Sequence, residues 1–258
     1  MSDDCNRTPF WQRQPLLPKG IQDFLRARLD AALADPEARQ ALVWPTVLGA
    51  PRLRAAHPEG LPESALLDHA ARMLGALGHH DPAAAWRRHV ADWPDTAERG
   101  PAGWRPHAAW GAFEPLVSLR SGWQLAALTP LPLGERFPLA SGVSLFNHGL
   151  YHECHDALEP LWEQASGDLK AGLQGLILLA AGYHHLQLQN RAGLVAVWEE
   201  ALARLQDTGG ILSTAWGEVR FQTALDLTAR RLDHGKRMTD DAEFEALWAL
   251  ERPTWELA

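Results

Sequence analysis

The chain has 258 residues, of which 46% are hydrophobic and 22% charged, and its formal net charge is −8. This length and composition predict a globular chain with either one large domain or two small ones. The negative charge and the lack of a clustered Lys/Arg stripe argue against nucleic-acid binding, because phosphate contacts need a basic face.

The sequence also bears on where the protein works. Its longest apolar run extends from Gly175 to Tyr183, which is too short to span a membrane. The first residues, MSDDCNRTPFWQRQP, lack the order of a secretion signal. The two cysteines, Cys5 and Cys154, lie far apart and predict neither a disulfide framework nor a metal-ligand pair. We therefore expect a cytoplasmic protein with no membrane partner.

The predicted fold is mainly α, with a mostly helical N-terminal region (residues 1–138) and a C-terminal helical bundle (residues 139–258). Apolar residues at helical spacing predict helices in the first region at about residues 21–34, 37–44, 66–77 and 82–90. The second of these runs into Pro45, which is expected to end it. Asp81-Pro82 supplies a cap and a proline start for the last.

Between Arg99 and Arg136 the helical period disappears. Two apolar runs, Leu116–Leu119 and Trp123–Leu128, flank Arg120-Ser121-Gly122 and predict a short β-hairpin. A proline-containing connection then leads into the C-terminal bundle. The N-terminal region resembles no family that we recognise.

The C-terminal region is predicted to contain five helices. In chain order, they are one that starts at about His148, a second over Leu169–Gln189, a third stopped by Gly209-Gly210, a fourth over Ser213–Leu232 and a fifth from Thr239 or Asp240. The second is apolar nearly all the way round, which is typical of a helix buried between neighbours. It should therefore lie at the centre of the bundle.

One narrow stripe on the first of these helices carries titratable side chains. At 100° per residue, the stripe consists of His148, His152, His155 and Glu159. It adjoins the apolar arc of the helix, so it is expected at the edge of the core. Glu153, Asp156 and Glu163 fall beyond the stripe and are expected to face water.

The second helix has few polar groups, and their positions are informative. Gln174 and His185 share one stripe with the small residue Ala181, and His184 lies alongside. Buried polar groups need hydrogen-bond partners, so we expect these side chains to face the histidine stripe. The short link at Ser166-Gly167 predicts an antiparallel helix pair.

These two helices resemble a family of helical proteins called domain of unknown function 309, over about residues 144–206. The resemblance rests on Phe146-Asn147, Gly149, Tyr151, Glu153, His155, Leu158, Glu159, Trp162, Gln174-Gly175, Ile177, Ala180-Ala181, Asn190 and Ala192-Gly193. It implies a small all-α bundle in which a His-Glu signature faces a Gln-Gly helix, and it implies no activity. This chain departs from the pattern at His155-Asp156, at Pro160 and at the extra imidazole of His152. Pro160 predicts a kink or a re-aimed helix end.

Two kinds of function fit these residues. In the first, which we favour, the chain is a binding or structural module whose polar His/Glu/Gln cluster fixes the packing of two core helices. Its partner would be an unidentified small ligand or a protein, with a second copy of the chain among the candidates. The side chains expected to line a ligand pocket are Tyr151, Gln174 and His184.

The alternative is a metal-dependent enzyme of hydrolase type. The candidate ligands of a divalent transition metal, zinc or iron, are His152, His155, Glu159 and His185. The candidate catalytic residues are Glu153, His155 and Glu159. Such an ion would polarise a substrate or activate a bound water, with a carboxylate such as Glu153 taking the proton. The residues alone do not decide whether the protein is an enzyme.

Overall fold

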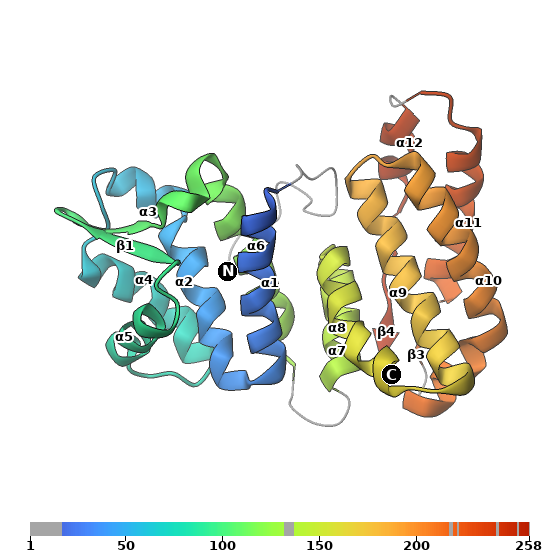
Figure 1. Ribbon diagram of the computed structural model, residues 1–258, viewed down its shortest axis with the longest axis horizontal. Helices are drawn as coiled ribbons and strands as arrows, with labels where there is room; N and C mark the ends of the chain where they lie inside the picture. The colour runs from blue at the N-terminus through green and yellow to red at the C-terminus, as the bar shows by residue number, and fades with distance from the viewer. Residues whose placement is uncertain are drawn as a thin grey trace. The chain divides into compact units, whose positions relative to one another are not determined.

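The computed structural model describes residues 17–131, 137–216, 219–220, 222–240, 243–251 and 253–257. Over these residues the chain is mainly helical with two short antiparallel strand pairs, which confirms the predicted fold class (Figure 1). The chain divides into two compact units, an N-terminal unit over Leu17–Leu131 and a C-terminal unit over Pro132–Ala258. None of the helices described here combines the length and the apolar character needed to cross a membrane.

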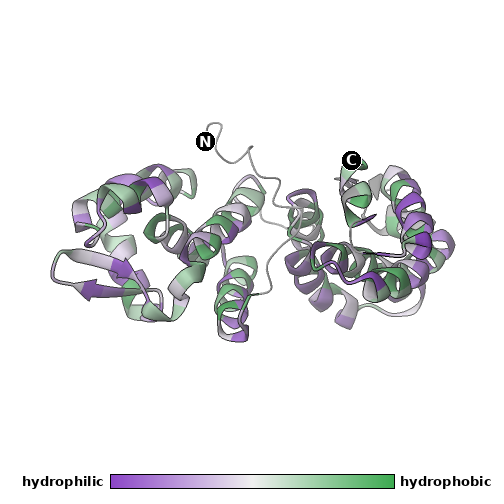
Figure 2. Cartoon of the chain, turned by 90° about the horizontal axis from the view of Figure 1, so that it is seen from above, coloured by the Kyte–Doolittle hydropathy of each residue, from purple (hydrophilic) through white to green (hydrophobic). Residues whose placement is uncertain are grey.

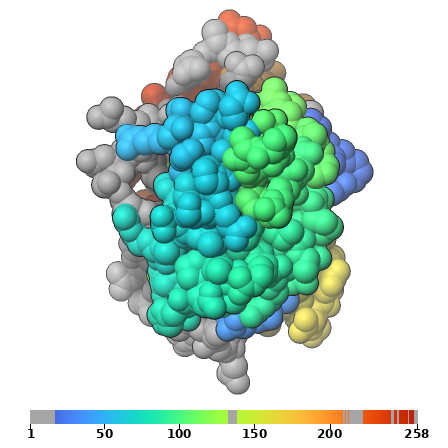
Figure 3. All heavy atoms as spheres, turned by 90° about the vertical axis from the view of Figure 1, so that its left-hand side faces the viewer, coloured from blue at the N-terminus to red at the C-terminus, as the bar shows by residue number. Residues whose placement is uncertain are grey.

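The N-terminal unit is built around the helix α2. Its elements are α1 (Lys19–Ala34), the 3-10 turn η1 (Pro36–Arg39), α2 (Gln40–Leu48), α3 (Pro51–Ala56), α4 (Glu63–Ala76), α5 (Pro82–Asp92), β1 (Ala97–Gly100), β2 (Gly103–Pro106), η2 (Ala108–Phe113) and α6 (Glu114–Leu128). Most of α2 is buried, and it packs against α1, α4, α5 and α6. Figure 3 shows one face of this unit, formed mainly by the segments between α3 and α6.

Of two helix bounds predicted in this unit from local sequence, one is confirmed and one is wrong. Asp81 caps α5 as predicted, because its side chain accepts a hydrogen bond of 2.9 Å from the backbone N–H of Ala84. The predicted end of a helix at Pro45 is wrong, since α2 continues through this proline to Leu48. Burial of this apolar helix outweighs the one backbone hydrogen bond that a proline removes.

The predicted hairpin over residues 116–128 is also wrong, because these residues lie inside α6. Gly122 resembles a turn residue in the sequence, but it faces α2, where an added Cβ would come 3.2 Å from Thr46 Cγ2. This glycine therefore permits close helix packing. The hairpin described in this unit instead joins β1 to β2, with Gly100 opposite Gly103.

The C-terminal unit is a mainly helical bundle with α9 at its centre. Its elements are α7 (Phe137–Asn147), α8 (Tyr151–Gln164), α9 (Gly167–Gln187), α10 (Arg191–Trp216), β3 (Val219–Arg220), α11 (Gln222–Arg237), α12 (Phe244–Ala249) and β4 (Glu256–Leu257). α9 packs against α8 and α10 (Figure 1). Most helices carry both apolar and polar residues, the pattern of amphipathic helices (Figure 2).

Glycines explain why α9 and α10 lie so close together. A Cβ on Gly172 would come 2.9 Å from Leu212 Cγ, and one on Gly175 would come 2.7 Å from Leu205 Cγ. Both leucines are buried in α10. The absence of a side chain on α9 thus makes room for the leucines of its neighbour.

Two predicted helix bounds differ in the structure. α10 does not stop at Gly209-Gly210, because its packing on α9 extends beyond these glycines to Leu212. The next helix consequently begins at Gln222 and not at Ser213. α8 includes the exposed Pro160, where the sequence predicts a kink or a re-aimed helix end, and continues to Gln164.

Candidate metal site

The helix that carries the candidate residues, α8, begins at Tyr151, so His148 lies outside it. His148 and Gly149 form the turn that follows α7, and Gly149 adopts a φ of +76° that suits glycine. The Nδ1 atom of His148 lies 2.8 Å from the backbone oxygen of Ser144. The predicted stripe therefore loses its first member, because the helix starts three residues later than the pattern required.

Asp156 lies at the centre of the histidines of α8. Its Oδ2 is 3.2 Å from Nδ1 of His152, and its Oδ1 is 3.1 Å from Nδ1 of His155. The Asp156 side chain is 4% exposed, whereas those of His152 and His155 are 39% and 35% exposed. One buried carboxylate thus holds two partly exposed imidazoles in place.

The structure corrects the expectation that Glu153 and Asp156 face water. Both residues are buried, with 5% and 7% of their surface exposed. α8 packs against α7 as well as α9, and two neighbouring helices cover a wider arc than one. The helical period of the sequence predicts only one partner helix for α8, and with one partner this arc would face solvent.

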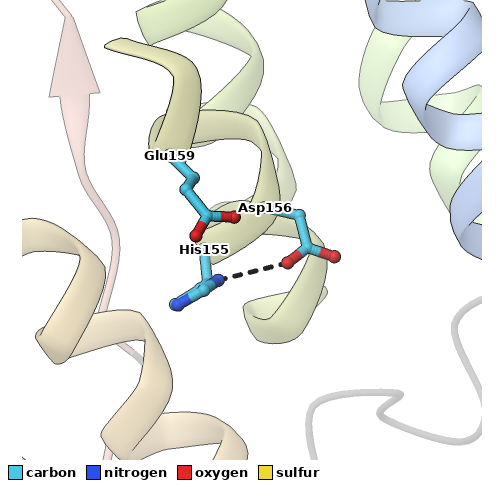
Figure 4. Close-up of side chains that lie close together, drawn as sticks. All are labelled: His155, Asp156 and Glu159. Carbon is cyan, nitrogen blue, oxygen red and sulfur yellow. Dashed lines mark hydrogen bonds and ion pairs between the residues drawn. The ribbon is translucent and has the colours of Figure 1, made fainter. Parts of the chain in front are cut away.

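Glu159 completes a compact group one helical turn after His155. One ligand atom from each of His155, Asp156 and Glu159 lies within 4.8 Å of the others. Figure 4 shows the three side chains on the same side of α8, with His155 bonded to Asp156. Neighbouring ligands of a tetrahedral zinc ion are about 3.3 Å apart, a spacing that falls within this 4.8 Å range.

A further imidazole comes from α9. The rings of His184 and His152 have centroids 5.0 Å apart and are inclined at 74°. Two imidazoles bound to one zinc ion have centroids about 5 Å apart, as Zn–N distances and the tetrahedral angle require. The rings of His152 and His155 are further apart, at 6.3 Å. The partner helix thus supplies His184 to the cluster of α8.

Two predicted members of the cluster lie elsewhere. The Nδ1 atom of His185 is 3.2 Å from Nδ2 of Asn190, and its ring fills the space beside Gly193, at the turn between α9 and α10. Burial lowers the pKa of His185, which favours the neutral ring. Gln174 is half-buried and, within the described part of the chain, makes no hydrogen bond to the cluster.

Tyr151, expected to line a pocket, belongs to the aromatic core. It is 1% exposed, and its ring centroid lies 5.0 Å from those of both Phe146 and Tyr183. Tyr183 in turn donates or accepts a hydrogen bond of 2.8 Å with the hydroxyl of Thr228. This core fixes the start of α8, immediately before His152.

Cys154 is not a suitable metal ligand, although it lies within the same helical turn as the cluster. Burial raises the pKa of its thiol well above the ordinary value, and the charges of Glu153 and Asp156 raise it further. A thiol held in its protonated form is a poor metal ligand. The cluster is therefore one of imidazoles and carboxylates.

Sequence reasoning missed two residues that organise this region. Asp156 was assigned to solvent, although its spacing of four from His152 was a signal that the two side chains meet. Gln187 is 3% exposed, and its Nε2 donates a hydrogen bond of 2.8 Å to the backbone oxygen of Gly149. It ties the end of α9 to the turn before α8, and nothing in its local sequence announced this role.

One of the comparisons with known proteins gave a match. Residues 139–197 match the model of a family described as Domain of unknown function (DUF309). This match confirms the predicted resemblance, and it includes α8, α9 and every residue of the cluster. A search of curated proteins and a search of solved structures each gave no match.

Proposed function

We propose that the DUF309 segment of this chain is a metal-binding module that holds one divalent transition-metal ion, zinc or iron. The observation that carries the proposal is the arrangement of His155, Asp156 and Glu159, whose ligand atoms lie within 4.8 Å of one another. Imidazole and carboxylate are suitable ligands for both metals. An ion here would stabilise the folded chain, because it would bind that state and not the unfolded one.

The short distances around Asp156 support a ligand set as well as a hydrogen-bonded cluster. The separations of 3.1 and 3.2 Å between its oxygens and the two imidazoles are close to the spacing of about 3.3 Å between ligands on one zinc ion. An ion bound between His155, Asp156 and Glu159 would place positive charge beside a carboxylate that is 4% exposed. His152 would be the fourth protein ligand, with His184 next to it.

The experiment that tests this proposal is a metal analysis of the tag-free full chain by inductively coupled plasma mass spectrometry. We expect about one zinc or iron ion per chain, and its loss in His155→Ala and Asp156→Asn. His185→Ala is the matched control, because His185 lies one residue from His184 but contacts Asn190. A chain without metal, or equal loss in the control, would leave the cluster as a structural hydrogen-bond network.

A second candidate function, a metal-dependent hydrolase, is favoured by the exposure of the imidazoles. Since His152 and His155 are 39% and 35% exposed, an ion bound to them would keep a position that water can reach. Glu153 is buried, so in this candidate Glu159 is not a ligand but the carboxylate that accepts a proton, and His152, His155 and Asp156 hold the ion. Hydrolysis of model esters and phosphoesters by the metal-loaded chain, lost in Glu159→Gln with metal content unchanged, tests this candidate.

We also propose a cytoplasmic location and separate folding of residues 1–138 and 139–258. The free, buried thiol of Cys154 is consistent with a reducing compartment. Cell fractionation tests the location. Limited proteolysis of the full chain tests the boundary, with cleavage between residues 131 and 139 as the expected result.

A further inference from the structure

The last part of the described chain is bound to α7 by an unusually complete set of contacts. The indole of Trp255 is 1% exposed and stacks on Phe146, with ring centroids 3.9 Å apart and an interplanar angle of 13°. Nδ2 of Asn147 donates to the backbone oxygen of Trp255 at 2.7 Å, and the backbone N–H of Trp255 donates to Oδ1 of Asn147 at 2.8 Å. A single asparagine therefore satisfies both backbone groups of the tryptophan.

The neighbours of Trp255 are held as an extended peptide. Pro253 is buried and Thr254 is exposed, so side chains alternate between the protein and solvent. The following strand, β4, pairs antiparallel with β3, where Leu257 lies opposite Val219 (Figure 1). An aromatic anchor, backbone recognition and strand addition together are the features by which proteins bind peptide segments.

The receiving residues and the bound segment come from different parts of the chain. Phe146 and Asn147 lie within residues 139–197, which match the DUF309 family model, whereas the bound segment lies outside that match. The contact closes a separation of 108 residues. The two receiving residues Phe146 and Asn147 thus belong to the matched segment, whereas β3 and the bound segment do not.

We infer that Phe146, Asn147 and the edge of β3 form a docking site for an extended peptide of the type Pro-x-Trp. Its occupant is the chain's own C-terminal segment, residues 253–257, which binds reversibly to a domain that is folded without it. Trp255 supplies the apolar contact, and Asn147 selects an extended backbone by pairing with both its N–H and its C=O groups. The inference does not depend on a metal ion.

The test begins with the folded full chain. A specific protease site inserted at the exposed Glu251 allows the C-terminal segment to be cut after folding, so that it is held by non-covalent contacts alone. We expect the cut peptide to remain bound, to leave on dilution and to exchange with a fluorescent synthetic peptide of residues 252–258. The Trp255→Ala peptide should bind at least tenfold more weakly, whereas the Thr254→Ala peptide, changed at an exposed position, should bind as the native one does.

Two outcomes would overturn the inference. If the cut protein unfolds when the peptide leaves, the segment is an integral part of the core and not a docked ligand. If it stays folded but rebinds no peptide, the contact has no affinity of its own. Hydrogen exchange in the uncut chain gives an independent measurement: Asn147→Ala should speed exchange of the Trp255 amide at least tenfold, and Thr254→Ala should leave it unchanged. Equal exchange in both variants would also contradict the inference.

Discussion

Replacement of Gly182 by alanine tests the account of how α9, the helix that carries His184, is held in the bundle. Gly182 faces the indole of Trp198, which is fully buried and donates a hydrogen bond of 3.3 Å to the backbone oxygen of Leu179. An added Cβ would overlap this indole. Because Trp198 is buried on all sides, it has no open space into which it can move.

Two opposing effects determine how Gly182→Ala changes the free energy of unfolding. Alanine in a helix interior is about 1 kcal/mol more favourable than glycine. Overpacking of a filled core costs about 1–3 kcal/mol and sometimes more, and a clash with a fully buried indole lies at the upper end. We therefore expect Gly182→Ala to lower the free energy of unfolding by about 1–2 kcal/mol. Gly210→Ala, in α10 with no atom within 4 Å of its added Cβ, should raise it by up to about 1 kcal/mol.

The assay is urea unfolding of both variants followed by circular dichroism, with hydrogen exchange in α9 as a local measure of stability. The matched pair separates helix propensity from packing, since both variants make the same chemical change inside a helix. Equal stabilisation of Gly182→Ala and Gly210→Ala would show that the Cβ of residue 182 does not clash with Trp198.

Three further predictions concern buried groups. The pKa of His89 is lowered well below its ordinary value, first by burial and then by the charge of Arg28, so the unfolded chain binds the proton more readily than the folded chain. The free energy of unfolding should therefore fall as the pH drops below about 6.5, by up to about 1.4 kcal/mol per pH unit. Urea unfolding of His89→Phe should lack this contribution to the pH dependence. Arg28 is buried and donates hydrogen bonds to Asp95 and Thr96, so Arg28→Ala should lower the free energy of unfolding in urea by about 2 kcal/mol. The control Arg26→Ala, at an exposed position, should lower it by less than about 0.5 kcal/mol. Cys154, in a background without the other cysteine, should resist iodoacetamide in the folded chain and react once the chain is unfolded in urea, as mass spectrometry would detect.

The local pattern of the sequence was sufficient to predict the helix pair and most of the polar side chains that gather on one side of α8. Helical spacing placed His152, His155 and Glu159 on one side of α8, and the structure keeps them there. The same periodicity could not tell that α7 covers the neighbouring arc, because that contact depends on a separate helix. For this reason the burial of Asp156, the residue that joins the two imidazoles, was missed.

Two glycines also show that a local sequence pattern does not predict packing between distant segments. Gly122 and Gly210 are ordinary turn or stop signals when only their neighbours in sequence are considered. In the structure both lie inside helices, since the stability of those helices comes from packing against partners far away in the chain. The docking of Trp255 on Asn147, 108 residues away, has no local signal at all.

The most direct test of the proposed metal site is a crystal structure of the full chain grown with zinc, with diffraction data collected on both sides of the zinc absorption edge. We expect one anomalous peak bounded by His155, Asp156 and Glu159, at about 2.0–2.2 Å from the ligand atoms. A structure in which no peak lies there, and in which His155 and Asp156 remain bonded to each other at the present distance of 3.1 Å, would contradict the proposed metal site.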